Sequence, residues 1–120
     1  MSYDAALCDP ITHKVLELEH EHFMQGGTYC ASGTKELWLN ITYNYGPIYK
    51  NTAALGEDGI YKLNRLSGAE SISILKCAVA ELKDDVASDY WMPTEGNAKR
   101  ALLQLLAMAY MRPDGIWSIQ

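Results

Sequence analysis

The sequence lacks the features of a membrane-spanning or secreted, disulfide-bonded protein. Its 120 residues contain no apolar run near the roughly 18 residues that a membrane-spanning helix needs. Its start shows no basic segment followed by an apolar stretch, so no signal peptide is expected. The cysteines Cys8, Cys30 and Cys77 are widely spaced and form no Cys-x-x-Cys pair. These absences predict a cytoplasmic protein with reduced thiols, no membrane partner, and Cys77 as a small core residue.

Basic residues are also few. Ten Lys and Arg against fifteen Asp and Glu give a net charge of −5. This balance argues against a nonspecific nucleic-acid binder, because such proteins carry a basic face. Within residues 1–34, Lys14 stands alone against five acidic residues, Asp4, Asp9, Glu17, Glu19 and Glu21. The acidic face either keeps the protein soluble, mimics nucleic acid or meets a basic partner protein.

Motifs that dictate a reaction are absent as well. The sequence has no Gly-x-Ser-x-Gly elbow, no Gly-rich phosphate loop and no H-E-x-x-H motif. His20 and His22 fall on one side of an expected strand and are weak candidates for metal ligands. Cys30, in a glycine-flanked loop, is the candidate for a reactive thiol. We expect no cofactor, and a small metal- or Cys/His-dependent enzyme is the alternative to a binding protein.

The N-terminal half has the patterns of strands. From Ile11 to Phe23, apolar and acidic positions alternate, which predicts a strand with one wet side. The segment from Glu36 to Tyr45 is rich in aromatic and β-branched residues and predicts the clearest strand of the chain. Its apolar face carries Leu37, Leu39, Ile41, Tyr43 and Tyr45. A long hairpin, or a short strand around Thr28 to Cys30, is expected between the two.

The C-terminal half has the patterns of two helices. Ser67 and Glu70 form a capping box before an apolar run, which predicts a helix from Ala69 to about Asp84. Thr94 is expected to cap a second helix, Glu95 to Met111, that is apolar on nearly all sides. Asn51 and Thr52 are expected to cap a short helix that Gly56 and Gly59 soon interrupt, and Ile116–Trp117 should fold back onto the core. The predicted fold is one α+β domain, with a small antiparallel sheet from the N-terminal half packed against the two main helices.

The outer face of the strand Glu36–Tyr45 is the first candidate binding surface. Trp38, Asn40, Thr42 and Asn44 lie on it, and a solvated strand face more often carries Lys, Glu and Thr. Amides beside a tryptophan suit a binding surface, because they donate and accept hydrogen bonds without charge. The alternative is a covered sheet face whose amides satisfy neighbouring loops.

The start of the second helix is the other candidate binding surface. A helix N-terminus offers free N–H groups and a positive dipole, which favour an anion. Tyr90 and Trp91 precede it and can stack on a planar group. The polar side chains of this region are Asn97, Lys99, Arg100 and Gln104. They predict a small anionic or nucleotide ligand; the alternative is a capped helix with an aromatic staple and no ligand.

Three stretches carry a resemblance to a group of proteins. These are Gly26-Gly27-Thr28-Tyr29, the strand Glu36–Tyr45, and the segment Tyr90–Ala98 with the helix after it. In this layout the chain resembles small uncharacterised accessory proteins of bacteriophages and prophages. The resemblance implies a protein that works in a bacterial host cytoplasm and counters host defence. It would do so by blocking a host protein or by sequestering a nucleotide signal.

We therefore expect a non-enzymatic binding protein. Its expected partner is a host defence protein or a small anionic or nucleotide ligand. The aromatic and methionine content exceeds what a small core needs, which predicts a homo-oligomer. A structural phage component, with its aromatic surfaces as subunit contacts, is the other non-enzymatic alternative.

Overall fold

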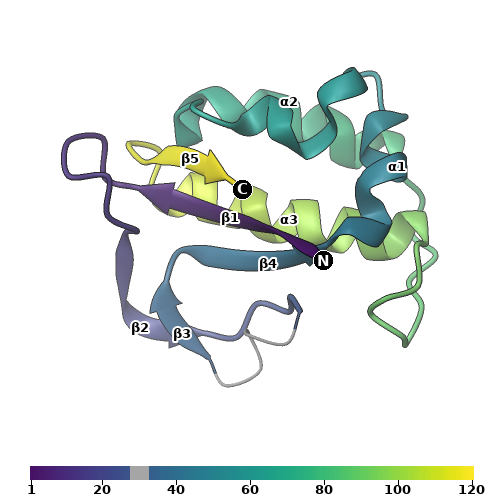
Figure 1. Ribbon diagram of the computed structural model, residues 1–120, viewed down its shortest axis with the longest axis horizontal. Coiled ribbons are helices and arrows are strands. Elements are labelled where there is room, and N and C mark those ends of the chain that lie inside the picture. Colours follow the sequence, from purple (N-terminus) through teal and green to yellow (C-terminus); the bar gives the residue numbers. More distant parts are fainter. Residues whose placement is uncertain (28–32) are drawn as a thin grey trace.

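Three strands form the central sheet in the computed structural model, which describes residues 1–27 and 33–120. Strand β1 (Ser2–Cys8) lies in the middle, antiparallel to β4 (Trp38–Thr42) on one side and to β5 (Ile116–Ile119) on the other. A separate two-stranded ribbon lies below the sheet in Figure 1, on the side of β4. It consists of β2 (Glu17–His22) and β3 (Thr34–Glu36). The predicted antiparallel sheet is confirmed, with one edge strand added from the C-terminal end.

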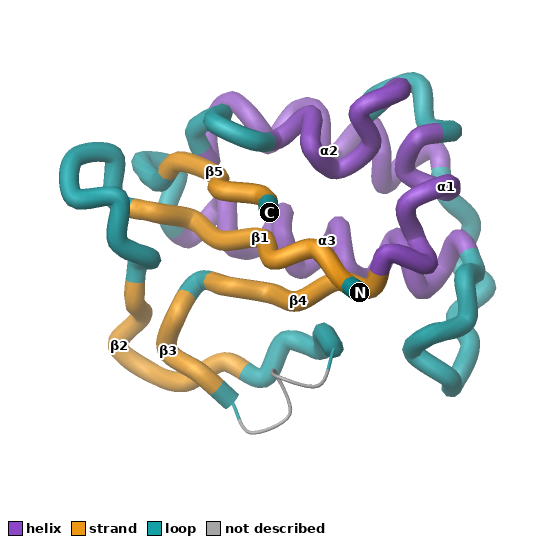
Figure 2. Tube along the Cα trace, in the orientation of Figure 1, coloured by secondary structure: helices purple, strands orange, loops and turns teal. Residues whose placement is uncertain are grey.

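Two long helices pack beside this sheet. Helix α2 is Gly68–Glu81 and helix α3 is Glu95–Met111, and α3 runs behind the three strands (Figures 1 and 2). The capping box of Ser67 and Glu70 is present, and Thr94 Oγ1 accepts a hydrogen bond from Asn97 N–H. Both predicted helices and the α+β fold class are confirmed. Three short helical segments connect the halves, η2 (Tyr43–Tyr45), α1 (Gly46–Lys50) and η3 (Gly56–Leu63).

The core lies between the inner sheet face and the helices. The sheet contributes alternate residues of its three strands, chiefly Ala5, Leu7, Leu39, Ile41, Trp117 and Ile119. Helix α3 contributes Ala98, Leu102, Leu105, Met108 and Ala109. The alternation of β4 leaves Trp38, Asn40 and Thr42 on the opposite, outer face. The sheet thus has one face committed to the core, and its other face carries polar residues together with Trp38.

The predicted strand Glu36–Tyr45 is wrong at both ends. The chain leaves β3 at Glu36 and enters β4 at Trp38, so Glu36 and the strand Trp38–Thr42 belong to different sheets. After Thr42 the backbone turns into η2, and Thr42 Oγ1 accepts the Asn44 N–H that begins it. Tyr45 is still buried in the core, but Tyr43 is partly exposed. A threonine hydroxyl that caps a helical turn here outweighs the β propensity of the tyrosines.

Four smaller expectations also need correction. The strand predicted from Ile11 begins only at Glu17, because Asp9 Oδ1 accepts the N–H groups of Ile11 and Thr12 in a turn. The short helix lies at Gly46–Lys50, with Asn51 as its C-cap. Cys77 is exposed on α2 rather than in the core. The central strand β1 was not predicted at all. Cys30 and the strand expected around Thr28 fall outside the described residues.

Candidate functional site

The outer face of β4 is divided between a covered part and an open part. Asn40 and Thr42 are buried, whereas Trp38 is half-buried. Tyr90 covers the first two by reaching the free edge of the strand: its Oη accepts from Thr42 N–H at 3.0 Å and donates to Asn40 O at 3.2 Å. Gly27 N–H also donates to Asn40 O. The edge of β4 is therefore closed by the segments around Gly27 and Tyr90.

The Asn40 side chain is held by the neighbouring strand β1. Its Nδ2 lies 2.7 Å from Ser2 Oγ and 2.9 Å from Asp4 Oδ1. A side chain at Gly27 would collide with Asn40 Oδ1, so the approach of this segment requires glycine. The Asn40 amide is thus hydrogen-bonded within the protein, which agrees with the alternative of a covered sheet face. Asn44 does the same at the end of η2, where its Nδ2 donates to Trp91 O at 2.8 Å.

Trp38 belongs to the open part of the face and lines a groove of about 330 Å³. In the register of the sheet Trp38 stands opposite Ala6 of β1, and Ala6 stands opposite Ser118 of β5. These two small residues form the floor. The other lining residues are Asp4, Cys8, His13, Val15 and Gln120. The groove joins Trp38 to residues from both ends of the chain, which the sequence did not place together.

The thiol in this groove is not an activated nucleophile. Cys8 is half-buried, and burial raises the pKa of its thiol from the ordinary value. A reactive cysteine has the opposite property, because a nearby cation, imidazolium or helix N-terminus stabilises its thiolate. The groove is therefore better suited to binding than to nucleophilic catalysis.

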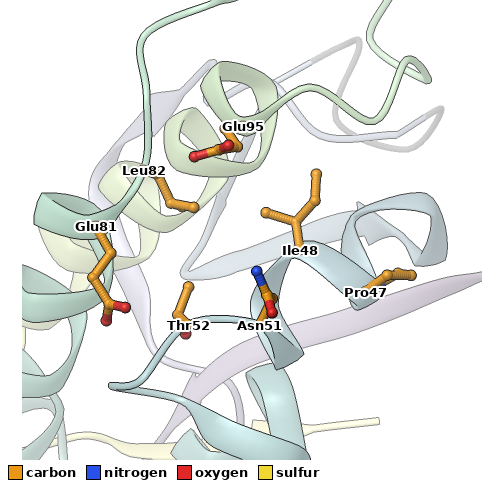
Figure 3. A pocket seen from close by; sticks show the side chains of 7 residues that line it. All are labelled: Pro47, Ile48, Asn51, Thr52, Glu81, Leu82 and Glu95. Atoms are coloured by element: carbon orange, nitrogen blue, oxygen red, sulfur yellow. The ribbon is translucent and has the colours of Figure 1, made fainter.

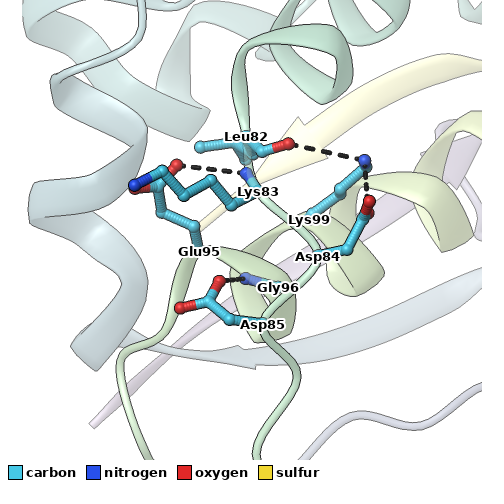
Figure 4. A network of polar contacts seen from close by, with 7 residues as sticks. All are labelled: Leu82, Lys83, Asp84, Asp85, Glu95, Gly96 and Lys99. Carbon is cyan, nitrogen blue, oxygen red and sulfur yellow. Dashed lines mark hydrogen bonds and ion pairs between the residues drawn. The ribbon is translucent and has the colours of Figure 1, made fainter.

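The start of α3 is closed by carboxylates of the preceding loop (Figure 4). Asp85 Oδ1 accepts the Gly96 N–H at 3.0 Å, and Glu95 Oε1 reaches back to Lys83 N–H. A Cβ atom at Gly96 would sit 2.5 Å from the backbone of Asp85 and Val86. A protein carboxylate and backbone thus occupy the place where the sequence predicted an anion. The prediction of a ligand there gains no support from this geometry.

The polar residues of α3 have separate structural partners. Asn97 is buried: its Oδ1 accepts from Ala87 N–H and its Nδ2 donates to Asp89 O and Met92 O. Lys99 pairs with Asp84 at 2.6 Å (Figure 4). Gln104 exchanges two hydrogen bonds with the backbone of Gln25. The fourth residue, Arg100, is half-buried. Burial raises the pKa of the Tyr45 phenol, and the positive charge of Arg100 offsets part of that rise.

A second hollow of about 340 Å³ lies between α1 and the ends of the long helices (Figure 3). Glu81 and Glu95 are on its lining, with Leu82 between them in the close view. Neither carboxylate is available as a paired acid and base, since Glu81 accepts from Ala53 and Ala54 N–H. Glu95 is engaged with Lys83 N–H. Both carboxylates of this hollow thus accept hydrogen bonds from backbone N–H groups of neighbouring loops.

Among the described residues, the two histidines of the β2–β3 ribbon are not part of a metal site. His22 Nε2 lies 2.6 Å from Glu36 O, and its Nδ1 accepts from Met24 N–H, so both ring nitrogens serve the ribbon. His20 is exposed. Within residues 1–27 and 33–120, no group of three His, Cys, Asp or Glu side chains is placed to hold a metal ion.

The ribbon presents an acidic surface. Glu17, Glu19, Glu21 and Glu36 are all exposed, and Glu17 and Glu36 are register partners across the two strands. The two ion pairs of the described chain, Lys99–Asp84 and Arg112–Asp114, involve none of these four carboxylates. We call these four residues the acidic ribbon surface. Like charges placed opposite each other in a sheet are unfavourable, so folding alone does not account for this pair.

Comparison with known proteins adds no family to this description. No family model, curated protein or solved structure matches the chain. The likeness to phage-encoded accessory proteins accordingly stays an expectation. In the described part of the chain, no helix combines the length and apolarity needed to cross a membrane.

Proposed function

We propose that this protein acts by binding, and that the acidic ribbon surface docks on a basic face of a partner protein and blocks it. The observation that carries the proposal is the register pair of Glu17 and Glu36. Two facing carboxylates cost the ribbon stability, and a basic partner would relieve that cost by neutralising them. A host defence protein of a bacterium is the partner class that the phage resemblance favours.

The position of the surface supports protein docking. The ribbon is a sheet of its own, so a partner can contact it without opening the core (Figure 1). Phe23, which follows β2, is 70% exposed and adds an apolar side chain beside the carboxylates. Charged groups around an apolar anchor are the usual composition of a protein interface.

Binding of an anion or nucleotide is less well supported than binding of a basic protein. The start of α3 carries the carboxylates of Asp85 and Glu95, and Lys99 is engaged by Asp84. An anion there would meet two negative charges and would have to displace a lysine partner. The enzyme alternative draws no support from Cys8, whose thiol is held neutral by burial.

Self-association through α3 is a second part of the proposal, and a specific observation favours it. Leu103, Tyr110 and Met111 are spaced along one outward stripe of the helix and are 44%, 56% and 44% exposed. Such a stripe fits a second copy of the same helix, related by a two-fold axis. Sedimentation should show a concentration-dependent dimer that Leu103→Lys abolishes, and a strict monomer at all concentrations contradicts this part.

The docking proposal is tested with a pair of charge-reversed variants. Glu19→Lys with Glu21→Lys changes the acidic ribbon surface, and Glu57→Lys with Asp58→Lys makes the same charge change on η3. Each variant and the wild type are used to capture proteins from a bacterial host lysate. Captured candidates are then purified and titrated by calorimetry at low and high salt.

The expected partner is basic, binds the wild type and the η3 variant equally, and loses at least about tenfold affinity for the ribbon variant. Its affinity for the wild type should also fall as salt increases. Equal weakening by both variants, or a partner that binds the ribbon variant as tightly as the wild type, contradicts the proposal.

A further inference from the structure

The groove on the outer sheet face has the construction of a small binding site. Its floor is made by Ala6 and Ser118, which stand next to each other across β1 and β5. Trp38 lines the same groove from β4, on the other side of Ala6. Small residues between larger ones leave room on a sheet face, and about 330 Å³ is within the range that small-molecule sites occupy.

A positioned carboxylate lies at one end of this groove. Asp4 lines it, and Asp4 Oδ1 accepts a hydrogen bond from Asn40 Nδ2 at 2.9 Å. The donor is itself fixed, because Asn40 is only 4% exposed and also bonds Ser2 Oγ. The second oxygen of Asp4 has no hydrogen bond with any residue in the described part of the chain. A buried amide thus orients a carboxylate whose other oxygen is available to a ligand.

The remaining lining does not neutralise that carboxylate. Among the described residues that line the groove there is no Lys or Arg, and the ionisable side chains besides Asp4 are those of Cys8 and His13. Burial keeps the Cys8 thiol protonated, so it behaves as a small apolar group. The groove therefore combines one negative group with an aromatic wall and a floor of small side chains.

We infer that this groove binds a small organic cation, an amidinium, guanidinium or amine on a compact flat body. The cation would pair with Asp4, and the body would lie over Ala6 and Ser118 beside the Trp38 indole. A carboxylate accepts hydrogen bonds from such a group, and an indole next to it favours positive charge. This site is separate from the acidic ribbon surface, so the two proposals can fail independently.

The test is a titration of the ¹⁵N-labelled protein with benzamidine, followed by nuclear magnetic resonance at about pH 7.5, where imidazole is mostly neutral. The expected result is saturable shifts of the Ala6 and Ser118 amides, with a Kd on the order of 1 mM, as for a ligand of few heavy atoms. Neutral benzamide has nearly the same shape and should bind at least about tenfold more weakly.

Two groove variants and two control variants decide the role of the groove. Asp4→Asn should weaken benzamidine binding about tenfold, while Asp58→Asn, an exposed carboxylate on η3, should leave it unchanged. Ser118→Leu fills the floor and should abolish binding without any change of charge. The Glu19→Lys, Glu21→Lys variant should bind benzamidine like the wild type. The inference is overturned if benzamidine gives no saturable shifts at these amides, if benzamide binds equally, or if folded Asp4→Asn and Ser118→Leu proteins bind like the wild type.

Discussion

The indole nitrogen of Trp117 donates a hydrogen bond to Ser71 Oγ at 2.8 Å, and both residues are almost completely buried. Trp117 lies on β5, at the end of the chain, and Ser71 lies in the first turns of α2. Ser71 Oγ in turn donates to Gly68 O at 2.7 Å. This short chain of hydrogen bonds joins the last strand of the sheet to the start of a helix, and it satisfies the one polar atom of the largest core side chain.

Removal of this hydroxyl should destabilise the protein. In Ser71→Ala the indole N–H of Trp117 loses its acceptor while remaining buried, which costs about 1–3 kcal/mol of unfolding free energy. Urea denaturation followed by circular dichroism measures the change. Ser73→Ala, at an exposed position of the same helix, is the matched control and should stay within about 0.5 kcal/mol of the wild type. Equal stability of the two variants would contradict a role for the Trp117–Ser71 bond.

Substitution of one of the facing carboxylates of the ribbon should instead stabilise the protein. Glu17→Gln or Glu36→Gln removes one charge from a register pair and should raise the unfolding free energy by about 0.2–1 kcal/mol. The double variant should gain little beyond either single one, since one substitution already removes the repulsion. Thermal unfolding at low salt is the measurement. Additive gains, or a loss of stability in the single variants, would show that the two carboxylates do not repel.

The hydrogen bonds of the Asn97 side chain should hold the loop before α3 in its conformation. Asn97→Ala deletes three hydrogen bonds to the backbone of residues 87–92 and leaves partly buried backbone groups without that partner, a loss of about 2 kcal/mol. Hydrogen exchange should accelerate in residues 85–92 more than in β1. Arg100→Ala, on the same helix but without a hydrogen bond to that loop, serves as the comparison. If exchange in the loop is unchanged in Asn97→Ala, the amide does not hold it.

Stability should fall at alkaline pH because of Tyr45. Burial raises the pKa of its phenol to about 12 from 10.0, and the neighbouring Tyr90 adds to the shift. The folded protein therefore holds this proton more tightly than the unfolded chain does. The resulting stability is complete below about pH 10 and is lost as the pH rises through about 12.

Urea unfolding at several pH values between 8 and 12 measures this decline. Tyr45→Phe removes the titrating group and also the hydrogen bond from Tyr45 Oη to Tyr90 O. The variant should be less stable at pH 8 yet lose stability less steeply toward high pH. Part of the decline should persist, because burial also raises the pKa of Tyr49. Identical slopes for wild type and variant would exclude Tyr45 as a source of the alkaline loss.

Local patterns were sufficient for the helices and insufficient for the strands. Helices α2 and α3 begin where a capping box and a threonine cap predicted, since those signals act within one turn of the chain. The strand patterns gave a sheet but misplaced its members. Tyr43 has high β propensity and still lies in η2, because the Thr42 hydroxyl caps a helical turn there.

The candidate sites also combine residues that local sequence patterns identified with residues that only the tertiary structure brings together. Trp38 was identified from the sequence as a residue that folding does not explain, and it lines the outer groove. Asp4 and Ser118, which complete that groove, were not identified, because neither has a local pattern that marks it. They come together only through the pairing of β1 with β4 and β5. The helix entrance was identified, but Asp85, which fills it, approaches from a loop whose course the sequence does not encode locally.

The sequence alone determined the fold class, the two long helices with their caps and the net negative charge, since these depend on composition and on neighbours within a few residues. The tertiary structure decided which strand is central. β1 has a run of small and mixed residues with little strand propensity of its own, and it is a strand because partners hydrogen-bond to both of its edges. Such pairing joins residues separated by most of the chain, and no local pattern records it.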